Sequence, residues 1–168
     1  MASTTPNKIL LQVNGAGVEA RPIFEYEADE ALTPGELVRF DADDELEPHG
    51  TAGGNALPIF VVENPYAETA AGAKAIDTDY ALGSYARVIY AQPGDLVYDW
   101  LADGQNVAKG AALVSDGAGA LQSGGTQAVD EGGTVTYTVY TDSVVGYADQ
   151  DLNNSAGGAR ARIKVRVA

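Results

Sequence analysis

The last residues of the chain alternate strictly between charged and apolar side chains, and this constrains the fold more than any other feature. Every second residue from 160 to 166 is basic: Arg160, Arg162, Lys164 and Arg166. The residues that follow them are small or aliphatic: Ala161, Ile163, Val165 and Val167. Successive side chains of a β-strand point to opposite faces, so this period of two predicts a strand with one cationic and one buried face.

Short apolar runs separated by turn residues extend the β pattern along most of the chain. Residues 134–140, ThrValThrTyrThrValTyr, alternate as well. Other strand-like segments, separated by several of the 20 glycines, are 21–26, 36–40, 58–62, 85–91 and 96–101. The alanine-rich residues 64–83 leave room for one helical turn. The pattern predicts an all-β fold: a small β-barrel or a β-tulip/sandwich with glycine-rich turns and an extended N-terminal arm.

One short motif occurs twice. ProGlyGluLeuVal at 34–38 returns as ProGlyAspLeuVal at 93–97, each time in front of a strand-like segment. Proline followed by glycine is a strong turn signal, so both copies predict a turn that leads into a strand. Chance or shared turn chemistry accounts for so short a match as well as duplication does.

We divide the chain into an N-terminal strand or arm, residues 1–17, and a single β-rich domain, residues 18–168. A polar start precedes the run IleLeuLeuGlnVal at 9–13. Such a run is typical of a first strand, and equally of an arm that completes a neighbour's sheet. In the second case the partner-binding residues are Ile9, Leu10, Leu11 and Val13.

The chain is strongly acidic, with a formal net charge of −14 and most of the acid before residue 64. An acidic surface is repelled by phosphates and anionic lipids, so we expect no nucleic acid and no membrane as a main partner. A need for solubility, or a salt-adapted host, would account for the acidity equally well. We find no secretory signal and no apolar run of membrane-spanning length, which predicts a soluble protein made in the cytosol.

The groups that catalysis needs are scarce. Cysteine is absent, and the one histidine, His49, lies in GluProHisGlyThr, where we expect an exposed turn. No serine lies in a Gly-x-Ser-x-Gly elbow, and the glycine-rich segment 117–125 lacks the lysine of a phosphate-binding loop. We therefore expect no enzyme activity and no cofactor.

Two acidic segments are candidates for calcium. Asp149, Asp151 and Asn153 have the spacing of the first ligands of an EF-hand loop, but the later positions lack the glycine and the glutamate that such a loop needs. Residues 41–45 form a denser acidic run, which is more typical of a solvated loop. We therefore predict no metal site.

One segment resembles the hammerhead barrel of biotinyl and lipoyl carrier domains. The spacing Val107-x-x-Gly110-x-x-Leu113, after the Gly-Asp pair at 94–95, fits that family. The hairpin that should carry the modified lysine, SerAspGlyAlaGly at 115–119, has none. The resemblance implies a barrel but no carrier function.

The cationic face at the end of the chain is open to two interpretations. Like charges on one strand face repel one another unless acid answers them. The stripe is either an edge strand guarded by charge against aggregation, or a surface that binds acid in the 25–47 region of a sister subunit or on another protein. Under the second interpretation the partner-binding residues are Arg160, Arg162, Lys164 and Arg166.

The C-terminal half of the chain resembles the head decoration (cement) proteins of tailed phages. Residues 144–168 are similar to the end of that family: a turn with Gly, Ala and Asp, a Gly/Ala spacer and an Arg-Ile-x-Val strand. ProGlyAspLeuVal at 93–97, with the glycine hairpins after it, is similar as well. The resemblance covers residues 85–168, while residues 1–84 are similar only in style.

This resemblance implies a β-barrel or β-tulip subunit on the outside of an assembled capsid. Such subunits bind the major capsid protein, often as a homotrimer, and stabilise contacts between neighbouring capsid proteins. We therefore expect a structural protein located in the virion. The alternative is a virion surface or fibre-type domain that binds a receptor or carbohydrate, with Trp100, Tyr98 and Tyr90 lining the site.

Overall fold

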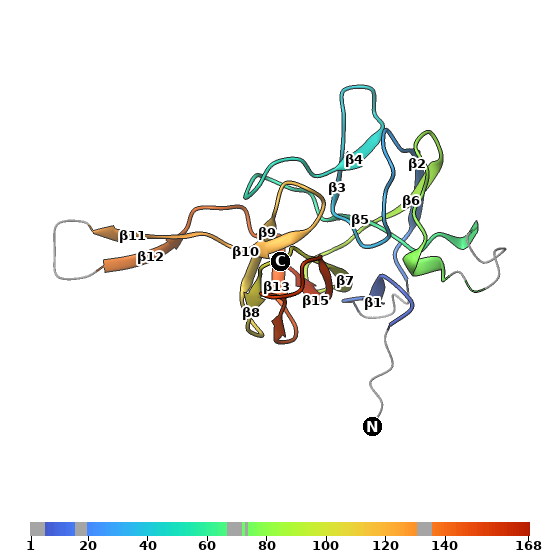
Figure 1. Cartoon of the computed structure of the whole chain (residues 1–168). Coiled ribbons are helices and arrows are strands. Elements are labelled where there is room, and N and C mark those ends of the chain that lie inside the picture. Colours follow the sequence, from blue (N-terminus) through green and yellow to red (C-terminus); the bar gives the residue numbers. More distant parts are fainter. Residues whose placement is uncertain (1–5, 16–19, 67–71, 73, 131–135) are drawn as a thin grey trace.

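The computed structural model describes residues 6–15, 20–66, 72, 74–130 and 136–168, and these are almost entirely strands and connecting turns (Figure 1). The first strands are β1 (Leu10–Gln12), β2 (Ile23–Glu27), β3 (Val38–Phe40), β4 (Leu46–Pro48), β5 (Ile59–Val61) and β6 (Tyr85–Tyr90). Then follow β7 (Leu96–Leu101), β8 (Asn106–Val107), β9 (Ala112–Ser115), β10 (Leu121–Ser123), β11 (Thr126–Asp130), β12 (Thr136–Tyr140), β13 (Gly146–Ala148), β14 (Leu152–Asn153) and β15 (Ala161–Val167). The expected all-β fold class is confirmed.

Five strands close into a small barrel. Their order is β7–β10–β9–β13–β15, and β15 pairs back to β7. The β7–β15 ladder runs from Ala161 opposite Leu101 to Arg166 opposite Leu96. The other edge of β7 is shared, because β10 meets it at Leu101 while β1 pairs at Leu96 and Val97. Closure leaves these strands without a long free edge.

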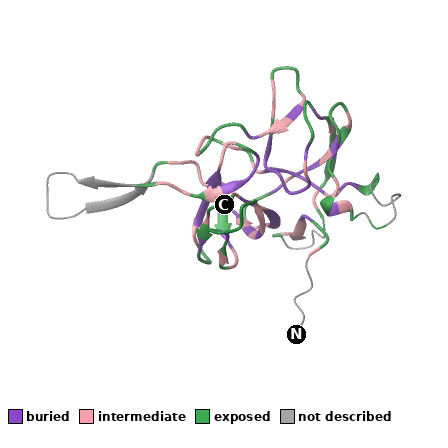
Figure 2. Cartoon of the chain, viewed as in Figure 1, coloured by how far each residue is buried: buried purple, intermediate pink, exposed green. Residues whose placement is uncertain are grey.

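The barrel core contains the apolar side of β15. Ile163, Val165 and Val167 are buried, and the residues between them are partly exposed. The alternation at the end of the chain is therefore confirmed as a strand with one buried face. Val97 and Leu101 of β7 belong to the same apolar cluster, and Figure 2 shows buried residues gathered along the barrel strands. Burying one such aliphatic side chain stabilises a fold by about 1.5–3 kcal/mol.

A smaller sheet packs beside the barrel. β2, β6 and β5 pair antiparallel in that order, and β3 and β4 form a hairpin. One side of the sheet shares an apolar cluster with the hairpin, including Leu46 of β4 and Val88 of β6. On the other side Phe60 of β5 and Ile89 of β6 join the barrel's cluster. The sheet is thus held between the hairpin and the barrel.

Strands β11 and β12 form a two-stranded ribbon that extends away from the rest of the molecule (Figure 1). They pair antiparallel, from Thr126 opposite Tyr140 to Asp130 opposite Thr136. At the base of the ribbon, Thr141 N–H donates to the Gly125 carbonyl at 3.3 Å. The strand expected at 134–140 is thus present from Thr136 onward, and its first two residues lie outside the described part of the chain.

The helical turn expected within residues 64–83 is a short 3-10 element, η2 (Ala75–Asp77). Its Ile76 side chain is buried in the barrel's apolar cluster. Among the described residues, no helix is long and apolar enough to cross a membrane.

The repeated motif forms the same turn twice. Its two glycines have φ of +93° and +87°, the left-handed values typical of a type II Pro-Gly turn. The residue after the glycine, Glu36 or Asp95, donates its N–H to the carbonyl of the residue before the proline, at 3.1 and 2.9 Å. Its carboxylate accepts the N–H of that same residue, Thr33 or Gln92, at 2.7 and 2.9 Å. Both copies therefore form the Pro-Gly turn that the sequence predicts.

Asp95 also anchors the N-terminal segment to the second turn. Its buried carboxylate accepts hydrogen bonds from Nε and Nη2 of Arg21 at 2.8 and 2.9 Å, and from Asn14 N–H at 2.7 Å. Burial alone would raise the pKa of Asp95, but Arg21 and the N–H groups of Asn14 and Gln92 outweigh it and lower the pKa. The segment around Asn14 is therefore tied to the turn that starts β7.

Substitution of Gly94 by alanine tests the close packing at this turn. A Cβ there would lie 2.2 Å from Asn14 Nδ2 and 2.7 Å from its Cγ. We expect Gly94→Ala to lower the free energy of unfolding by about 2 kcal/mol, since the left-handed conformation costs about 1 kcal/mol and the overlap adds to it. Gly104→Ala is the matched control, because Gly104 has a φ of +79° and nothing within 4 Å of its Cβ. Denaturant unfolding compares them, and equal losses would contradict the packing argument.

Candidate functional site

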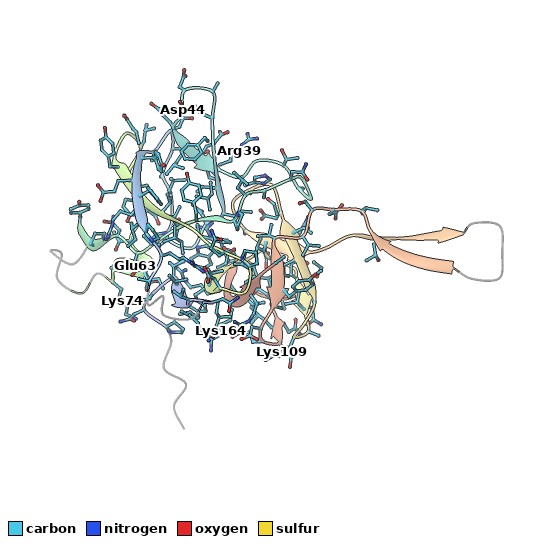
Figure 3. All side chains as sticks on the ribbon, turned by 180° about the vertical axis from the view of Figure 1, so that it is seen from behind. Arg39, Asp44, Glu63, Lys74, Lys109 and Lys164 are labelled. Carbon is cyan, nitrogen blue, oxygen red and sulfur yellow. The ribbon has the colours of Figure 1, made fainter. Side chains whose placement is uncertain are left out.

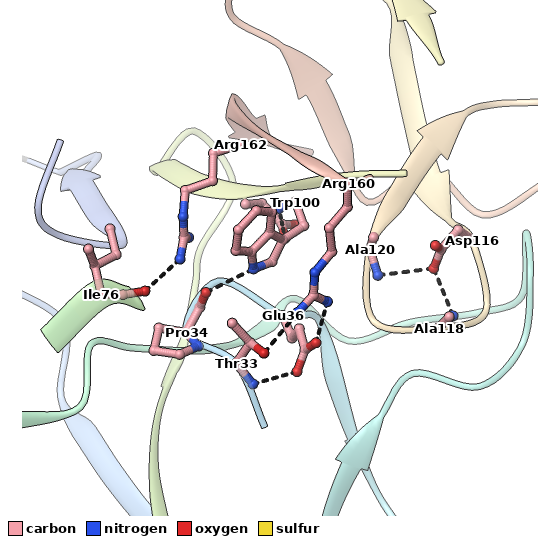
Figure 4. A network of polar contacts seen from close by, with 11 residues as sticks. Thr33, Pro34, Glu36, Ile76, Trp100, Asp116, Ala118, Ala120, Arg160 and Arg162 are labelled. Atoms are coloured by element: carbon pink, nitrogen blue, oxygen red, sulfur yellow. Dashed lines mark hydrogen bonds and ion pairs between the residues drawn. The ribbon is translucent and has the colours of Figure 1, made fainter. Parts of the chain in front are cut away.

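The cationic face of β15 lies over a tryptophan of β7. The antiparallel pairing sets Arg162 opposite Trp100. The guanidinium carbons of Arg160 and Arg162 lie 4.6 and 4.0 Å from the centre of the Trp100 ring. The indole Nε1 donates to the Pro34 carbonyl at 3.0 Å (Figure 4). Cation–π contacts hold the two arginines near each other despite their like charge.

Arg160 pairs with a buried acid. Its Nη1 donates to Glu36 Oε1, and its Nη2 donates to Thr33 Oγ1 at 2.8 Å (Figure 4). The Glu36 side chain is only 7% exposed. Burial raises the pKa of Glu36, while hydrogen bonds from Arg160 and from Thr33 N–H oppose the rise. Acid from the 25–47 region therefore faces the stripe within the same chain.

Arg162 is buried against η2. Its side chain is 9% exposed and lies 3.9 Å from the Asp77 carboxylate. Its Nη2 donates to the Ile76 carbonyl at 2.6 Å, whereas Nε and Nη1 have no hydrogen-bond partner among the described residues. Burial lowers the pKa of Arg162, and Asp77 opposes that effect. This side chain joins η2 to the barrel, and its removal from water costs free energy.

The two remaining cations of the stripe differ from each other. Arg166 donates to the Gly94 carbonyl at 2.9 Å and lies 3.5 Å from Asp149. Lys164 is partly exposed (Figure 3), and within the described residues its amino group makes no hydrogen bond or ion pair. Among the four cationic residues of the stripe, Lys164 is therefore the one whose amino group forms no ion pair with a described residue of its own chain.

The N-terminal candidates lie on the barrel of their own chain. Ile9 is buried, and its carbonyl accepts Tyr98 N–H at 2.8 Å. Leu10 pairs with β7, and both Leu10 and Leu11 pack on the barrel core. Val13 is partly exposed. Binding of a partner by these residues stays a prediction, and part of the 1–17 segment lies outside the described residues.

Asp99 is a buried carboxyl group that the sequence analysis missed. Its Oδ1 accepts Trp100 N–H at 2.6 Å, and Oδ2 has no partner among the described residues. Burial raises the pKa of Asp99 well above its ordinary value, and the Trp100 N–H and the Arg162 charge oppose this only in part. A signal was available, because Asp99 falls on the same strand register as the buried Val97 and Leu101.

His49 is buried, which corrects the expectation of an exposed turn. Its backbone N–H donates to the Leu37 carbonyl at 2.9 Å. This bond holds the residue after β4 against the interior. Nε2 lies 2.9 Å from the Asn55 carbonyl, an acceptor, so we assign the ring hydrogen to Nε2. Nδ1 then accepts from the Ser115 hydroxyl at 2.8 Å. Both polar ring atoms are satisfied internally, and the side chain joins β4 to β9.

Three carboxylates gather at the β3–β4 turn, where a cation could be held. Oxygen atoms of Asp29, Asp41 and Glu45 lie within 4.8 Å of one another. Asp41 Oδ1 accepts the backbone N–H groups of Asp43 and Glu45 at 2.9 and 2.8 Å, so it closes the loop. Burial and the neighbouring carboxylates raise the pKa of Glu45. The acidic run at 41–45 was visible in the sequence, but the approach of Asp29 was not.

The EF-hand-like segment, residues 149–153, forms contacts within the fold. Asp151 Oδ1 accepts Lys109 N–H at 2.8 Å. Asp149 lies 3.2 Å from Lys109 Nζ and also faces Arg166. These carboxylates therefore hold the Lys109 loop and the end of β15.

The predicted aromatic residues divide between two places. Tyr98 and Trp100 lie against Arg162, with the guanidinium carbon 5.7 and 4.0 Å from their ring centres. Tyr90 instead meets Phe24 edge to face, with ring centres 5.3 Å apart. A mainly apolar groove of about 400 Å³ opens there, which we call the Phe24 groove; it is lined by Arg21, Pro22, Phe24, Tyr26, Tyr90 and Gln92. In the sequence, Phe24 and Tyr26 are part of a strand-like segment and carry no separate sign of a binding site.

Comparison with known proteins adds no relative to this picture. No protein-family model matches the chain, and a search of curated proteins finds no match.

Asp99→Asn should stabilise the protein at neutral pH. A carboxyl group whose pKa is raised by folding costs stability above its unfolded pKa of about 3.9, by about 1.4 kcal/mol for each unit of the rise. We expect a Tm at least about 2 °C higher than wild type at pH 7, and a difference that vanishes below about pH 3, where both states are protonated. Thermal unfolding across this pH range, with the exposed Asp103→Asn as control, tests it. A lower Tm at pH 7 would contradict the assignment.

Arg160→Met should destabilise the protein because it leaves the buried Glu36 without its cation. We expect a loss of about 1–3 kcal/mol at pH 7, shrinking below about pH 4 as Glu36 becomes protonated in both states. Arg39→Met is the matched control, since the Arg39–Glu47 pair at 2.8 Å has an arginine side chain that is 45% exposed. Such surface pairs contribute about 0–1 kcal/mol. Equal losses in urea unfolding would show that burial of Glu36 adds nothing.

Proposed function

We propose that this chain is a structural virion protein that binds the outside of an assembled capsid. Its partner in this proposal is the major capsid protein, it acts as a homotrimer, and it stabilises contacts between neighbouring capsid proteins. One observation carries the proposal: all five strands of the closed barrel come from residues 96–167. These lie within residues 85–168, the stretch that resembles head decoration proteins. The resembling stretch therefore supplies every strand of the closed barrel.

The charge distribution supports a position on the outer surface. The net charge of −14 is repelled by packaged DNA. The chain's own groups pair with much of the cationic stripe, namely Arg160, Arg162 and Arg166. Lys164 is left to meet acid on the capsid surface, and contacts that are weak one by one become strong when they are repeated in an oligomer on a lattice.

Binding of a receptor or carbohydrate is the alternative, and one observation favours a location for it. The Phe24 groove presents aromatic rings around a cavity of about 400 Å³, the kind of concave surface that takes a small ligand. Trp100 suits this role less well, because two guanidinium groups lie over its ring. In this alternative the protein would be present in few copies per particle.

Saturable uptake by undecorated heads tests the proposal. We expect purified protein to bind expanded heads of the cognate virus in a fixed ratio to capsid subunits, and to raise the temperature at which the heads lose their DNA. The increase in particle mass, measured by light scattering, gives the ratio. Absence of uptake at protein concentrations up to about 100 µM, equivalent to binding weaker than about −5.5 kcal/mol, would overturn the proposal.

Lys164→Glu should weaken this uptake at least about tenfold, because it replaces the unanswered cation by an anion. Arg39→Glu makes the same change in charge on β3, above Lys164 in Figure 3, and should leave uptake within about twofold of wild type. Thermal unfolding of both variants separates a loss of binding from a loss of fold. Equal weakening by both would indicate a general charge effect instead of a contact at Lys164.

A further inference from the structure

The arginines and the lysines of this chain differ in what their charges contact. Every arginine lies within 3.9 Å of a carboxylate of its own chain. Of the lysines, Lys109 alone forms an ion pair within the described residues, with Asp149 at 3.2 Å. Lysine is therefore the cation that the fold leaves available at the surface. Lys164 and Lys109 both lie toward the lower edge of the molecule in Figure 3.

The outer face of β13 and β15 places an aromatic side chain beside the cationic stripe. β13 lies between β9 and β15 in the barrel. Tyr147 stands opposite Arg166 in the antiparallel ladder, so both side chains point to the same face. Gly146 and Ala148, the neighbours of Tyr147 in β13, are buried, whereas Tyr147 is 43% exposed. An exposed tyrosine therefore lies next to a cation on the outer wall of the barrel.

The same face continues to Lys164 and Lys109. Asp149 follows β13, and its N–H donates to the Lys164 carbonyl at 2.8 Å. Its carboxylate lies 3.2 Å from Lys109 Nζ and 3.5 Å from Arg166 Nη2. Two cations thus share one carboxylate, and Lys164 adds a third positive charge. We call Tyr147, Lys164, Arg166 and Lys109 the Tyr147 face, which keeps an excess of cations in a chain with a net charge of −14.

The Tyr147 face is open to solvent, unlike the other end of the cationic stripe. At that other end, Arg160 is held by Glu36 in the first Pro-Gly turn, and Arg162 by η2. On the Tyr147 face, by contrast, the side chains of Arg166 and Lys109 are 39% and 65% exposed. The stripe therefore has one end that joins parts of the chain and one end that a partner can reach.

The chemistry of the Tyr147 face favours an acidic protein segment as its partner. Aromatic residues and arginine are enriched in protein interfaces, and the charges around them select the partner. An excess of cations selects carboxylates. A long polyanion such as nucleic acid would extend beyond the face, where the acidic chain repels it. Physiological salt screens charges beyond about 8 Å, so the local excess of cations outweighs the distant acid in a short contact.

We propose that the Tyr147 face is the surface by which this chain docks on the capsid, and that it binds an acidic segment of the major capsid protein. Tyr147 and Arg166 form the centre of the contact, and Lys164 and Lys109 form its charged rim. The inference rests on the proposed function and adds the docking surface and the chemistry of the segment it binds. A second copy of this chain is the competing occupant, although two copies that each carry a charge of −14 repel one another.

Acetylation of lysines tests the contact on the wild-type protein. Protein alone and protein bound to expanded heads of the cognate virus are treated with acetic anhydride, and mass spectrometry measures the reaction at each lysine. We expect Lys164 and Lys109 to react at least about tenfold more slowly in the bound protein, as a site that is at least about 90% occupied would. Lys8 and Lys74 are exposed lysines outside the Tyr147 face, and they should react within about twofold of their rate in the protein alone.

A pair of tyrosine variants tests the centre of the contact. Tyr147→Ala should weaken uptake by heads at least about tenfold, because it removes the aromatic side chain at the centre. Tyr85→Ala is the matched control, since it removes an exposed ring from β6, and it should leave uptake within about twofold of wild type. Thermal unfolding shows whether each variant is folded.

The results separate failure of this inference from failure of the proposed function. Uptake by Tyr147→Ala equal to that of wild type, or unchanged reactivity of Lys164 in bound protein, would overturn the inference and leave the proposed function standing. Absence of uptake by wild type would overturn both. Protection of Lys164 in concentrated protein without heads would assign the face to a second copy, and protection by duplex DNA would assign it to phosphates; either result would overturn the acidic segment.

Discussion

The ladder between β7 and β15 holds the rest of the structure in place. It closes the barrel, and its two faces make different contacts. Inward, Ile163 and Val165 complete the core. Outward, Arg162 comes to lie on Trp100. Side chains alternate along a strand, so the pairing register of β15 with β7 sets both faces together. A shift of that register by one residue would turn the arginines into the core. The same constraint puts Asp99 among apolar side chains, at a cost in stability.

The outward face of this ladder then connects the barrel to distant parts of the chain. Arg160 reaches Glu36 in the first Pro-Gly turn, and Arg162 reaches η2. The second Pro-Gly turn, through Asp95, holds Arg21 and the segment after β1. The sequence left this stripe open as a charge-guarded edge or a partner surface, and in the fold three of its four cations contact groups of their own chain. The chain as a whole keeps a net charge of −14, which is consistent with the proposed position outside a DNA-filled shell.

The β11–β12 ribbon is the element that extends farthest from the rest of the molecule. Closure of the barrel removes its edges, and β4 meets the outer side of β2 at the bridge between Ala28 and Leu46. Unpaired backbone groups are a liability in a soluble protein unless something covers them.

The sequence by itself determined the local structure: the period of two placed a strand at 161–167, and Pro-Gly placed the turns at 34–38 and 93–97. These features follow from backbone geometry over a few residues. Only the tertiary structure decided which groups meet. Glu36 lies 124 residues before Arg160, His49 turned inward against expectation, and the closed strand order brought β15 back to β7. Such pairings depend on long-range packing, for which a single sequence carries no local signal, because many partners have the right chemistry and only the fold selects one.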